Sequence, residues 1–135
     1  METVTEGDNP MATWTTDELD EISITDELNL QTERGDGTLR DPVTTWVVRH
    51  DDDVFVRAIK GRNGWYRGTR TRHEGHIRSG GIDKDVTFLD ADADVGLNDV
   101  IDTEYQAKYS GYPADIVGRV INAQARSATI KLVPR

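Results

Sequence analysis

The residues best suited to binding chemistry are the cationic and aromatic side chains between Arg34 and Arg78. This stretch holds 10 of the 16 lysines and arginines, all three histidines and two of the three tryptophans, against six acidic residues. Its formal charge is therefore +4, and the remaining residues carry −13 to reach the net charge of −9. A cationic, aromatic block in an otherwise acidic chain indicates where a flat, negatively charged ligand could bind.

Four cations of this block form a candidate anion site, because they lie where a predicted strand ends and in the turn that follows: Arg57, Lys60, Arg62 and Arg67. Arginine binds phosphate as a planar fork, and Gly61 and Gly64 would let backbone N–H groups approach an anion closely. The alternative is a solvated turn that balances the acidic cluster Asp51–Asp53. The sequence alone leaves both interpretations open.

The aromatic residues Trp65 and Tyr66 directly follow that turn. An aromatic pair beside cations could stack on a heterocyclic ligand, and it could equally fill the core or close one end of a barrel. Trp46 lies inside a predicted strand and is predicted to be a core residue.

Two patterns imitate metal sites but fail on spacing. On a strand, His73 and His76 would face opposite sides and could not bind the same ion. The acidic run Asp90–Asp94 resembles the beginning of a calcium-binding loop, but Ile101 stands where the bidentate glutamate belongs. We therefore predict no metal site and a solvated acidic loop. No hydrolase or nucleotide-binding motif identifies a catalytic residue, so catalytic residues stay unknown at this stage.

Short apolar and β-branched runs predict six strands: Leu28–Thr32, Val43–His50, Val54–Lys60, His76–Arg78, Val86–Leu89 and Ala128–Val133. The second and third carry apolar residues on both faces, as expected inside a packed barrel. Three helices are predicted: Thr16–Ser23 after a capping box of Thr15 and Glu18, Leu97–Tyr109, and a short helix beginning at Pro113. Consecutive antiparallel strands with helices at the ends are typical of an α+β fold containing a small barrel.

The length of 135 residues predicts one core, with a flexible tail over residues 1–13 and a single domain over residues 14–135. No apolar run approaches the ~20 residues of a membrane helix, and the acidic segment Met1–Asn9 does not resemble a signal peptide, so we expect a cytoplasmic protein. The absence of cysteine excludes disulfides, thiolate metal sites and a cysteine nucleophile. A pI of 4.7 argues against nucleic-acid binding.

Short blocks occur in a characteristic order across Trp14–Arg135: Asp36–Pro42, Trp46–Arg49, Val56-Arg57, Gly61-Arg62, Trp65–Arg67, Ser79–Gly81, Asp85–Phe88, Ala107–Tyr109 and Leu132–Arg135. In these blocks the chain resembles a prokaryotic family catalogued as domain of unknown function 2255. That family is in turn similar to the split-barrel flavin-binding proteins, which include pyridoxamine-phosphate oxidases and deazaflavin-dependent nitroreductases.

The resemblance implies a six-stranded antiparallel split β-barrel with about three flanking helices. It also implies a homodimer that binds FMN or a deazaflavin at the subunit interface. The residues it implicates in cofactor binding are Arg57, Lys60 and Arg62 for the phosphate, Trp65 and Tyr66 for the ring, and Arg40 and Arg67 to close the anion site. The phosphate-binding Ser/Thr and Lys pattern of the oxidases is absent, so these cations would have to replace it.

Three functions follow from these expectations. The leading hypothesis is an oxidoreductase in which the bound cofactor transfers hydride to a small organic acceptor. The second is a non-catalytic member of the same fold that binds a small anion or a protein. The third is a module for single-stranded nucleic acid with Trp65 and Tyr66 as stacking platforms, which the net charge of −9 opposes.

Overall fold

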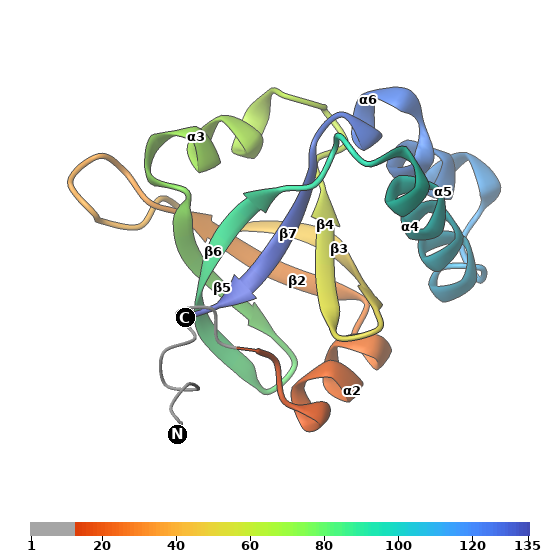
Figure 1. The fold of residues 1–135 in the computed structure, drawn as a ribbon, viewed down its shortest axis with the longest axis horizontal. Helices are drawn as coiled ribbons and strands as arrows, with labels where there is room; N and C mark the ends of the chain where they lie inside the picture. The colour runs from red at the N-terminus through yellow and green to blue at the C-terminus, as the bar shows by residue number, and fades with distance from the viewer. Residues whose placement is uncertain (1–12) are drawn as a thin grey trace, which may run out of the picture.

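Six antiparallel strands close into a barrel in the order β2-β3-β4-β7-β6-β5, as the ribbon shows (Figure 1). The computed structural model describes residues 13–135, so the predicted tail lies outside the described residues except for Thr13. The strands are β2 Glu27–Thr32, β3 Val43–His50, β4 Asp53–Arg57, β5 Glu74–Ser79, β6 Ile82–Asp90 and β7 Thr129–Pro134. The predicted α+β class and six-stranded split barrel are confirmed.

Strands β3 and β4 are buried on both faces, as their apolar residues predicted. Val47 and Val56 face the barrel core, while Val48 and Phe55 belong to a second apolar cluster outside the barrel. The helix α4, Val95–Lys108, contributes Ile101 and Tyr105 to that second cluster. Because neighbouring residues of these strands are buried on opposite faces, Val47-Val48 and Val54-Phe55-Val56 form continuous apolar runs.

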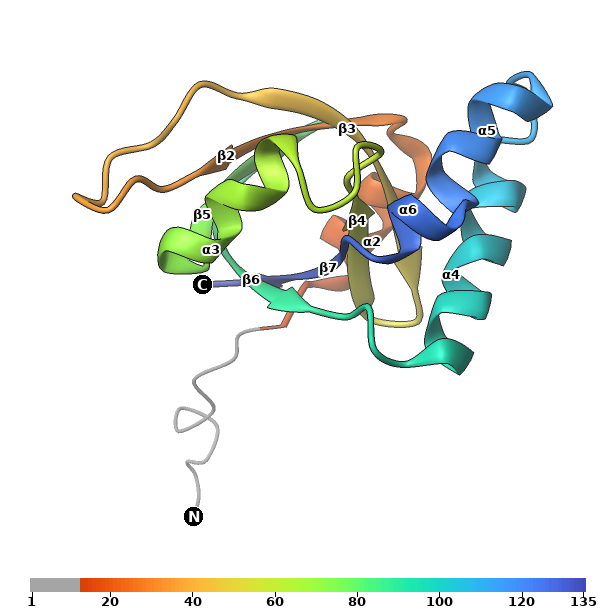
Figure 2. The ribbon, with the colours of Figure 1, turned by 90° about the horizontal axis from the view of Figure 1, so that it is seen from above.

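The α-helices other than the short α3 (Thr69–Arg72) pack at two places around the barrel. Helix α2, Thr16–Ile24, begins with the predicted capping box and buries Leu19 and Ile22 in the barrel core. Helices α4, α5 (Ala114–Ile121) and α6 (Ala123–Arg126) lie together on the opposite side of β3 and β4 from the barrel interior (Figures 1 and 2). The sequence predicted α2, α4 and α5 but not the single-turn α6, which is too short to show a helical period.

The end of β4 differs from the prediction, which extended the strand to Lys60. The strand ends at Arg57, because Ala58–Gly61 form a turn in which the Gly61 N–H donates to the Ala58 carbonyl at 2.9 Å. Gly61 has a φ of +67°, a conformation that glycine adopts without strain. This turn takes the chain away from the barrel into the 3-10 helix η1, Gly64–Gly68, and the short helix α3, Thr69–Arg72, neither of which the sequence predicted.

We predicted a solvated acidic loop between β6 and α4, but three of its carboxylates have partners in the protein. Asp94 caps α4 by accepting a hydrogen bond from the Leu97 N–H at 3.0 Å. Asp92 accepts from Arg62 Nη2 at 2.8 Å, and Asp90 pairs with Arg70, whose hydrogen bond lowers the pKa of that carboxyl group. Asp90 and Asp92 therefore neutralise two arginines of the cationic block.

The His73 and His76 pair also differs from its expected geometry. His73 lies outside the strand, where it ends α3 in a left-handed conformation with a φ of 58°. His76 lies on β5 and pairs with Asp83 and Asp85. Within residues 13–135, no group of three or more potential ligands could hold a metal ion. In the same part of the chain, no helix has the length and apolar character to cross a membrane.

Candidate functional site

Two adjoining pockets lie beside the barrel and share Val43, Gly64 and Trp65 as lining residues. The first, with a volume of about 560 Å³, is called here the large pocket. The second, with a volume of about 360 Å³, is called the small pocket. Both volumes are in the range of small-molecule sites, and Trp65 lines both of them.

The large pocket has three walls from different parts of the chain. One wall is the β3 segment Val43–Trp46, and the second comes from residues 58–65, which include Ile59 and Lys60. The third wall is α5, through Ile116, Arg119 and Val120. Apart from the charged residues Glu27, Lys60 and Arg119, the lining is dominated by apolar and aromatic side chains. Such a surface suits a flat organic molecule that carries negative charge.

Trp46, predicted to be a core residue, is half-buried and contributes to both core and pocket. Its ring stacks on Tyr109 with centroids 3.9 Å apart and an interplanar angle of 5°. The Tyr109 hydroxyl in turn accepts a hydrogen bond from the Val47 N–H at 3.0 Å. Because the ring is held by this packing, Trp46 presents a fixed aromatic surface to the pocket.

The small pocket lies between β2, the β2–β3 loop and η1. Arg40 Nη1 donates to Thr32 Oγ1 at 3.2 Å and to the Glu33 carbonyl at 2.7 Å. Within residues 13–135 its Nε and Nη2 make no hydrogen bond, so these donors are available to a ligand. A Cβ on Gly68 would lie 2.1 Å from Thr32 Oγ1, so only glycine allows η1 to pack this closely against β2.

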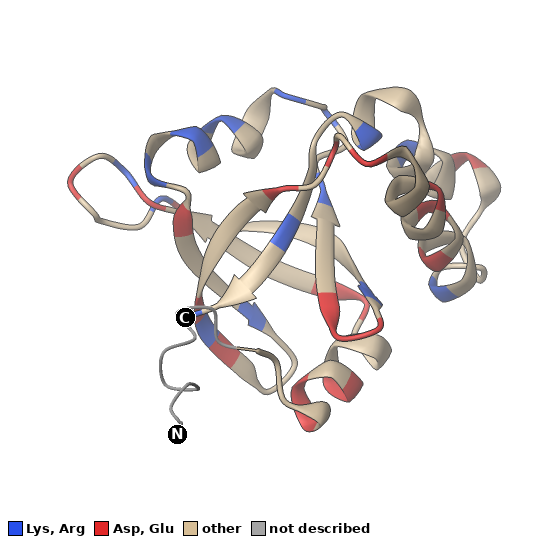
Figure 3. Cartoon of the chain, viewed as in Figure 1, with Lys and Arg blue, Asp and Glu red and all other residues tan. Residues whose placement is uncertain are grey.

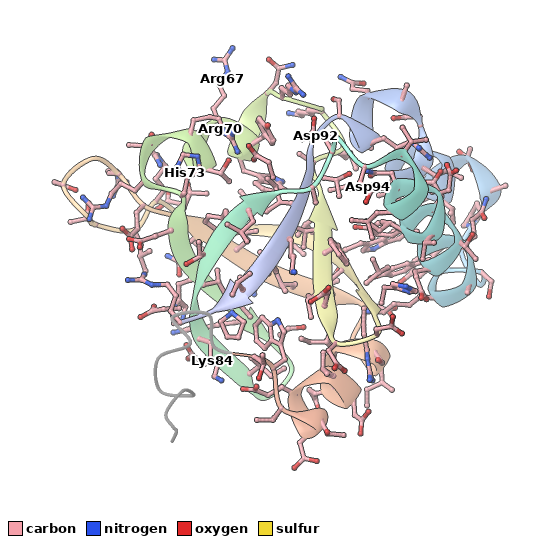
Figure 4. All side chains as sticks on the ribbon, viewed as in Figure 1. Arg67, Arg70, His73, Lys84, Asp92 and Asp94 are labelled. Carbon is pink, nitrogen blue, oxygen red and sulfur yellow. The ribbon has the colours of Figure 1, made fainter. Side chains whose placement is uncertain are left out.

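The structure brings four predicted site residues to these pockets. Lys60 lines the large pocket, Arg40 and Arg67 line the small one, and Trp65 lines both. Arg67 is exposed, and its guanidinium extends from η1 away from the barrel (Figure 4). The predicted concave cationic surface therefore exists for part of the set.

Arg57 does not belong to this surface, contrary to the prediction. Its side chain is fully buried, and its five N–H groups have partners on three elements, β7, α4 and α5. The Nε donates to Thr129 Oγ1 at 2.9 Å, and Nη1 donates to Asp102 Oδ1 at 2.5 Å and to the Val120 carbonyl at 2.9 Å. Nη2 donates to both oxygens of Asn98 at 3.1 and 2.8 Å. Arg57 therefore joins α4 and α5 to the barrel.

Arg62 and Tyr66 also lie outside the two pockets. Arg62 lines neither pocket: its Nε donates to the Ser127 carbonyl at 3.2 Å, and Nη2 binds Asp92. Tyr66 is buried in the barrel core with 6% of its surface exposed, and the Arg70 guanidinium lies 4.6 Å from the centre of its ring. The 3-10 turn of η1 directs consecutive residues differently, so Trp65 lines the pockets while Tyr66 does not.

A family model described as an uncharacterized protein conserved in bacteria (DUF2255) matches residues 18–132. The chain belongs to this family. No curated protein matches the sequence. Two solved structures share the fold of this DUF2255 chain at low sequence identity, which supports the split-barrel architecture and no more.

The first solved structure is HutZ, the heme storage protein from Vibrio cholerae. It has 13% identity and a TM-score of 0.66, and the match covers 89% of each chain. The second is the conserved hypothetical protein Rv2991 from Mycobacterium tuberculosis. It has 12% identity and a TM-score of 0.58, and the match covers 93% of the DUF2255 chain and 81% of Rv2991.

The cations of the DUF2255 chain fall into two groups. Most pair with an acidic side chain or donate to backbone carbonyls, as Arg70 does with Asp90 and Lys108 with three carbonyl oxygens. Within residues 13–135, the lysines and arginines whose side chains have neither kind of partner are Lys60, Arg67 and Arg119. All three line the pockets.

Charge is distributed unevenly over the DUF2255 fold. Lys and Arg positions follow the segment from the end of β4 through η1 to α3, while acidic positions gather on α2, the β3–β4 turn and α4 (Figure 3). The pockets therefore open beside the cationic part of a molecule that is acidic elsewhere. An anion would be attracted to this part of the surface.

Sequence analysis missed Arg119, the pocket residue contributed by α5. It lies far along the chain from the cationic block, so charge clustering gave no signal. A usable signal was the spacing of Ile116, Arg119 and Val120, because residues three and four apart share one helical face. That face would have been recognised only once α5 was known to pack beside β3.

Proposed function

We propose that this protein binds FMN or a deazaflavin in the two pockets and uses it as an oxidoreductase on a small organic acceptor. The observation that carries the proposal is that the unpartnered cations of residues 13–135 surround the pockets lined by Trp65. These side chains are exposed and make no ion pair within residues 13–135, so they are available to an anion that approaches the pockets.

The small pocket suits the phosphate or acidic tail of such a cofactor. Arg40 is partly buried and is held in place by two hydrogen bonds, so its remaining donors are oriented before a ligand arrives. Arg67 and Lys60 are exposed and can turn toward an anion. Arginine and phosphate form short, charge-assisted and often bidentate hydrogen bonds, which would anchor one end of the ligand.

The large pocket suits the ring system. Trp65 is half-buried against the barrel core, and Trp46 is fixed by its stack on Tyr109. Between them the pocket is lined by branched apolar residues such as Val43 and Ile116. Flat aromatic ligands gain stacking and burial against such walls, about 0.5–1.5 kcal/mol for each aromatic pair beyond the buried area.

Heme is the other planar anionic ligand suggested by a structural neighbour, since HutZ is a heme storage protein. Heme iron normally takes a His, Cys, Met or Tyr side chain as its axial ligand. Among the described residues that line the two pockets, none is of these four types. The lining therefore fits a metal-free ring better than heme.

When bound, a flavin or deazaflavin would supply the hydride-transfer chemistry. The protein would bind the acidic end through Arg40, Lys60 and Arg67 and orient the ring with Trp65. Homodimerisation, which the family resemblance implies, would place a second copy near the pockets and exclude water from the ring. Ile59, which lines the large pocket and is 48% exposed, is apolar surface that such a partner would cover.

The test is ligand binding by purified protein, measured by absorbance and by thermal unfolding with FMN, riboflavin, a deazaflavin and hemin. We expect FMN or the deazaflavin to raise the unfolding temperature, and riboflavin, which lacks the phosphate, to raise it less. Arg40→Gln and Trp65→Ala should each weaken binding. Arg78→Gln, which removes a charge from the β5–β6 hairpin outside both pockets, is the matched control.

The opposite pattern rejects the proposal. If hemin alone stabilises the protein, or if Arg78→Gln weakens flavin binding as much as Arg40→Gln does, the pockets are not a flavin site. A protein that binds flavin without reducing any acceptor would correspond to the non-catalytic alternative. The nucleic-acid alternative is less favoured than before, because Tyr66 is buried and cannot stack on a base.

A further inference from the structure

Arg119 lies on α5, the helical wall of the large pocket. Helix α5 buries Val117 and Val120, and the Val120 carbonyl accepts a hydrogen bond from Arg57 at 2.9 Å. The side chain of Arg119 itself is exposed and has no ion pair or hydrogen bond within residues 13–135. A cation that lines a largely apolar pocket from a helix held to the barrel, and that has no partner among the described residues, is arranged to recognise an anion in the pocket.

The wall around Arg119 indicates what kind of anion it would be. Ile116 and Val120 lie on the same helical face, and Trp46 lines the same pocket from β3. Lys60 and Arg119 reach the pocket from different elements, the β4–η1 connection and α5, so each can hold its own anionic group. Glu27 also lines the large pocket and would repel a second negative charge on the same small molecule.

We propose that Arg119 is the specificity-determining residue for a second ligand of the large pocket, an apolar, flat molecule that carries a single carboxylate. This proposal rests on the proposed function in that the cofactor's acidic end is assigned to Arg40, Lys60 and Arg67, which leaves Arg119 for the acceptor. The planar guanidinium matches a carboxylate through two parallel hydrogen bonds, and the apolar wall replaces water around the rest of the molecule.

Benzoate is a suitable probe, with benzamide as its neutral isostere and phthalate as the dianion. Calorimetric titration of each into the protein, with and without FMN, would measure binding. We expect benzoate to bind more tightly than both comparison molecules. Arg119→Gln should weaken benzoate about tenfold or more, as loss of a hydrogen bond to a charged group does, and should leave benzamide unchanged.

Two further variants separate the role of the fork from the role of charge. Arg119→Lys keeps the charge but not the paired donors, so benzoate affinity should fall between the wild type and Arg119→Gln. Arg78→Gln removes one exposed cation elsewhere and should leave benzoate affinity within twofold. Equal losses in Arg78→Gln and Arg119→Gln, or equal affinities for benzoate and benzamide, would overturn the proposal.

The same titrations distinguish this proposal from the proposed function. FMN affinity should be within twofold of wild type in Arg119→Gln. Arg119-dependent benzoate binding in a protein that ignores FMN would support this proposal and reject the flavin assignment, while FMN binding without benzoate binding would do the reverse. A change in molar mass by light scattering in Arg119→Gln would also overturn the proposal, because Arg119 would then pair with a carboxylate of a second copy.

Discussion

Arg57 and Lys60 are separated by two residues in the sequence, yet the fold gives them opposite surroundings. Arg57 is fully buried with every donor satisfied, whereas the Lys60 side chain is exposed beside the large pocket and has no partner in the described part of the chain. The turn at Ala58–Gly61 makes the difference, because it ends β4 and takes the chain out of the barrel wall. One cation holds the fold together and the other is available to a ligand.

The comparison also connects the two regions. Arg57 binds Asn98 and Asp102 on α4 and the carbonyl of Val120 on α5, and α5 forms one wall of the large pocket. The buried arginine is therefore a positioning residue for a site that it does not touch. Stability and ligand binding should respond differently to changes in the two groups of cations.

The largest effect is expected for Arg57→Met, which removes the arginine donor from the Val120 carbonyl and from Asn98, whose side-chain oxygen then keeps only Thr129 Oγ1. We expect the free energy of unfolding in urea to fall by about 3 kcal/mol or more, as when one partner of a buried ion pair is removed. Arg126→Gln is the matched control, since Arg126 Nη1 binds the other oxygen of Asp102 at 2.6 Å from a more exposed position. It should cost less than about 1 kcal/mol. Equal costs would show that burial does not distinguish these arginines.

Gly68→Ala should give the next largest effect, because the added methyl group would collide with Thr32 and lie 3.1 Å from Arg40 Nη1. Overpacking of this kind costs about 1–3 kcal/mol. The displaced Arg40 should also bind phosphate or FMN more weakly. Gly118→Ala on α5 has open space around the new methyl group and should not destabilise the protein. Urea unfolding of both variants measures the difference, and a stable Gly68→Ala protein would contradict the close packing of η1.

The sequence predicted the elements well because their signals are local. The capping box of Thr15 and Glu18 and the alternation in β2, β5 and β6 depend on neighbouring residues. Whether a cation is paired or available to a ligand depends instead on residues far along the chain. Arg57, for example, is paired with Asn98 and Asp102 on α4. No local pattern distinguishes that arginine from Arg67.

Tyr66 shows the same limit at closer range. An aromatic pair in a loop was predicted to act as one surface, but η1 turns Trp65 toward the pockets and Tyr66 into the core. The contribution of α5 to the pocket was equally invisible, because it depends on how two distant helices pack on β3 and β4. Tertiary packing, and not residue type, decides which predicted residues form the site.

A smaller effect on stability is expected for His76, a partly buried histidine with two acidic partners. Burial lowers its pKa, but hydrogen bonds to Asp85 and Asp83 outweigh burial, so the net pKa is raised above the ordinary 6.5. A raised pKa in the folded state stabilises the protein below about pH 6.5, and this contribution is lost as pH rises through the folded-state value.

His76→Asn should therefore be less stable than wild type at pH 5.5 by up to about 1 kcal/mol, with the gap closing as pH rises above 6.5. Urea unfolding across pH 5 to 9 measures the gap. Arg126→Gln removes a charge whose partners, Asp99 and Asp102, have no ion pair with a histidine within residues 13–135, so its stability difference from wild type should stay flat with pH. A gap that widens with pH would reverse the sign of the argument.

The smallest effect on stability is expected for the cations without partners, and this prediction tests the comparison most directly. Lys60→Gln and Arg67→Gln remove no ion pair or hydrogen bond found within residues 13–135, so each should change the free energy of unfolding by at most about 0.5 kcal/mol. Both should nevertheless weaken FMN about tenfold, because their role is to meet an anion. A variant that loses stability without losing affinity would place these residues with Arg57, as part of the framework of the fold.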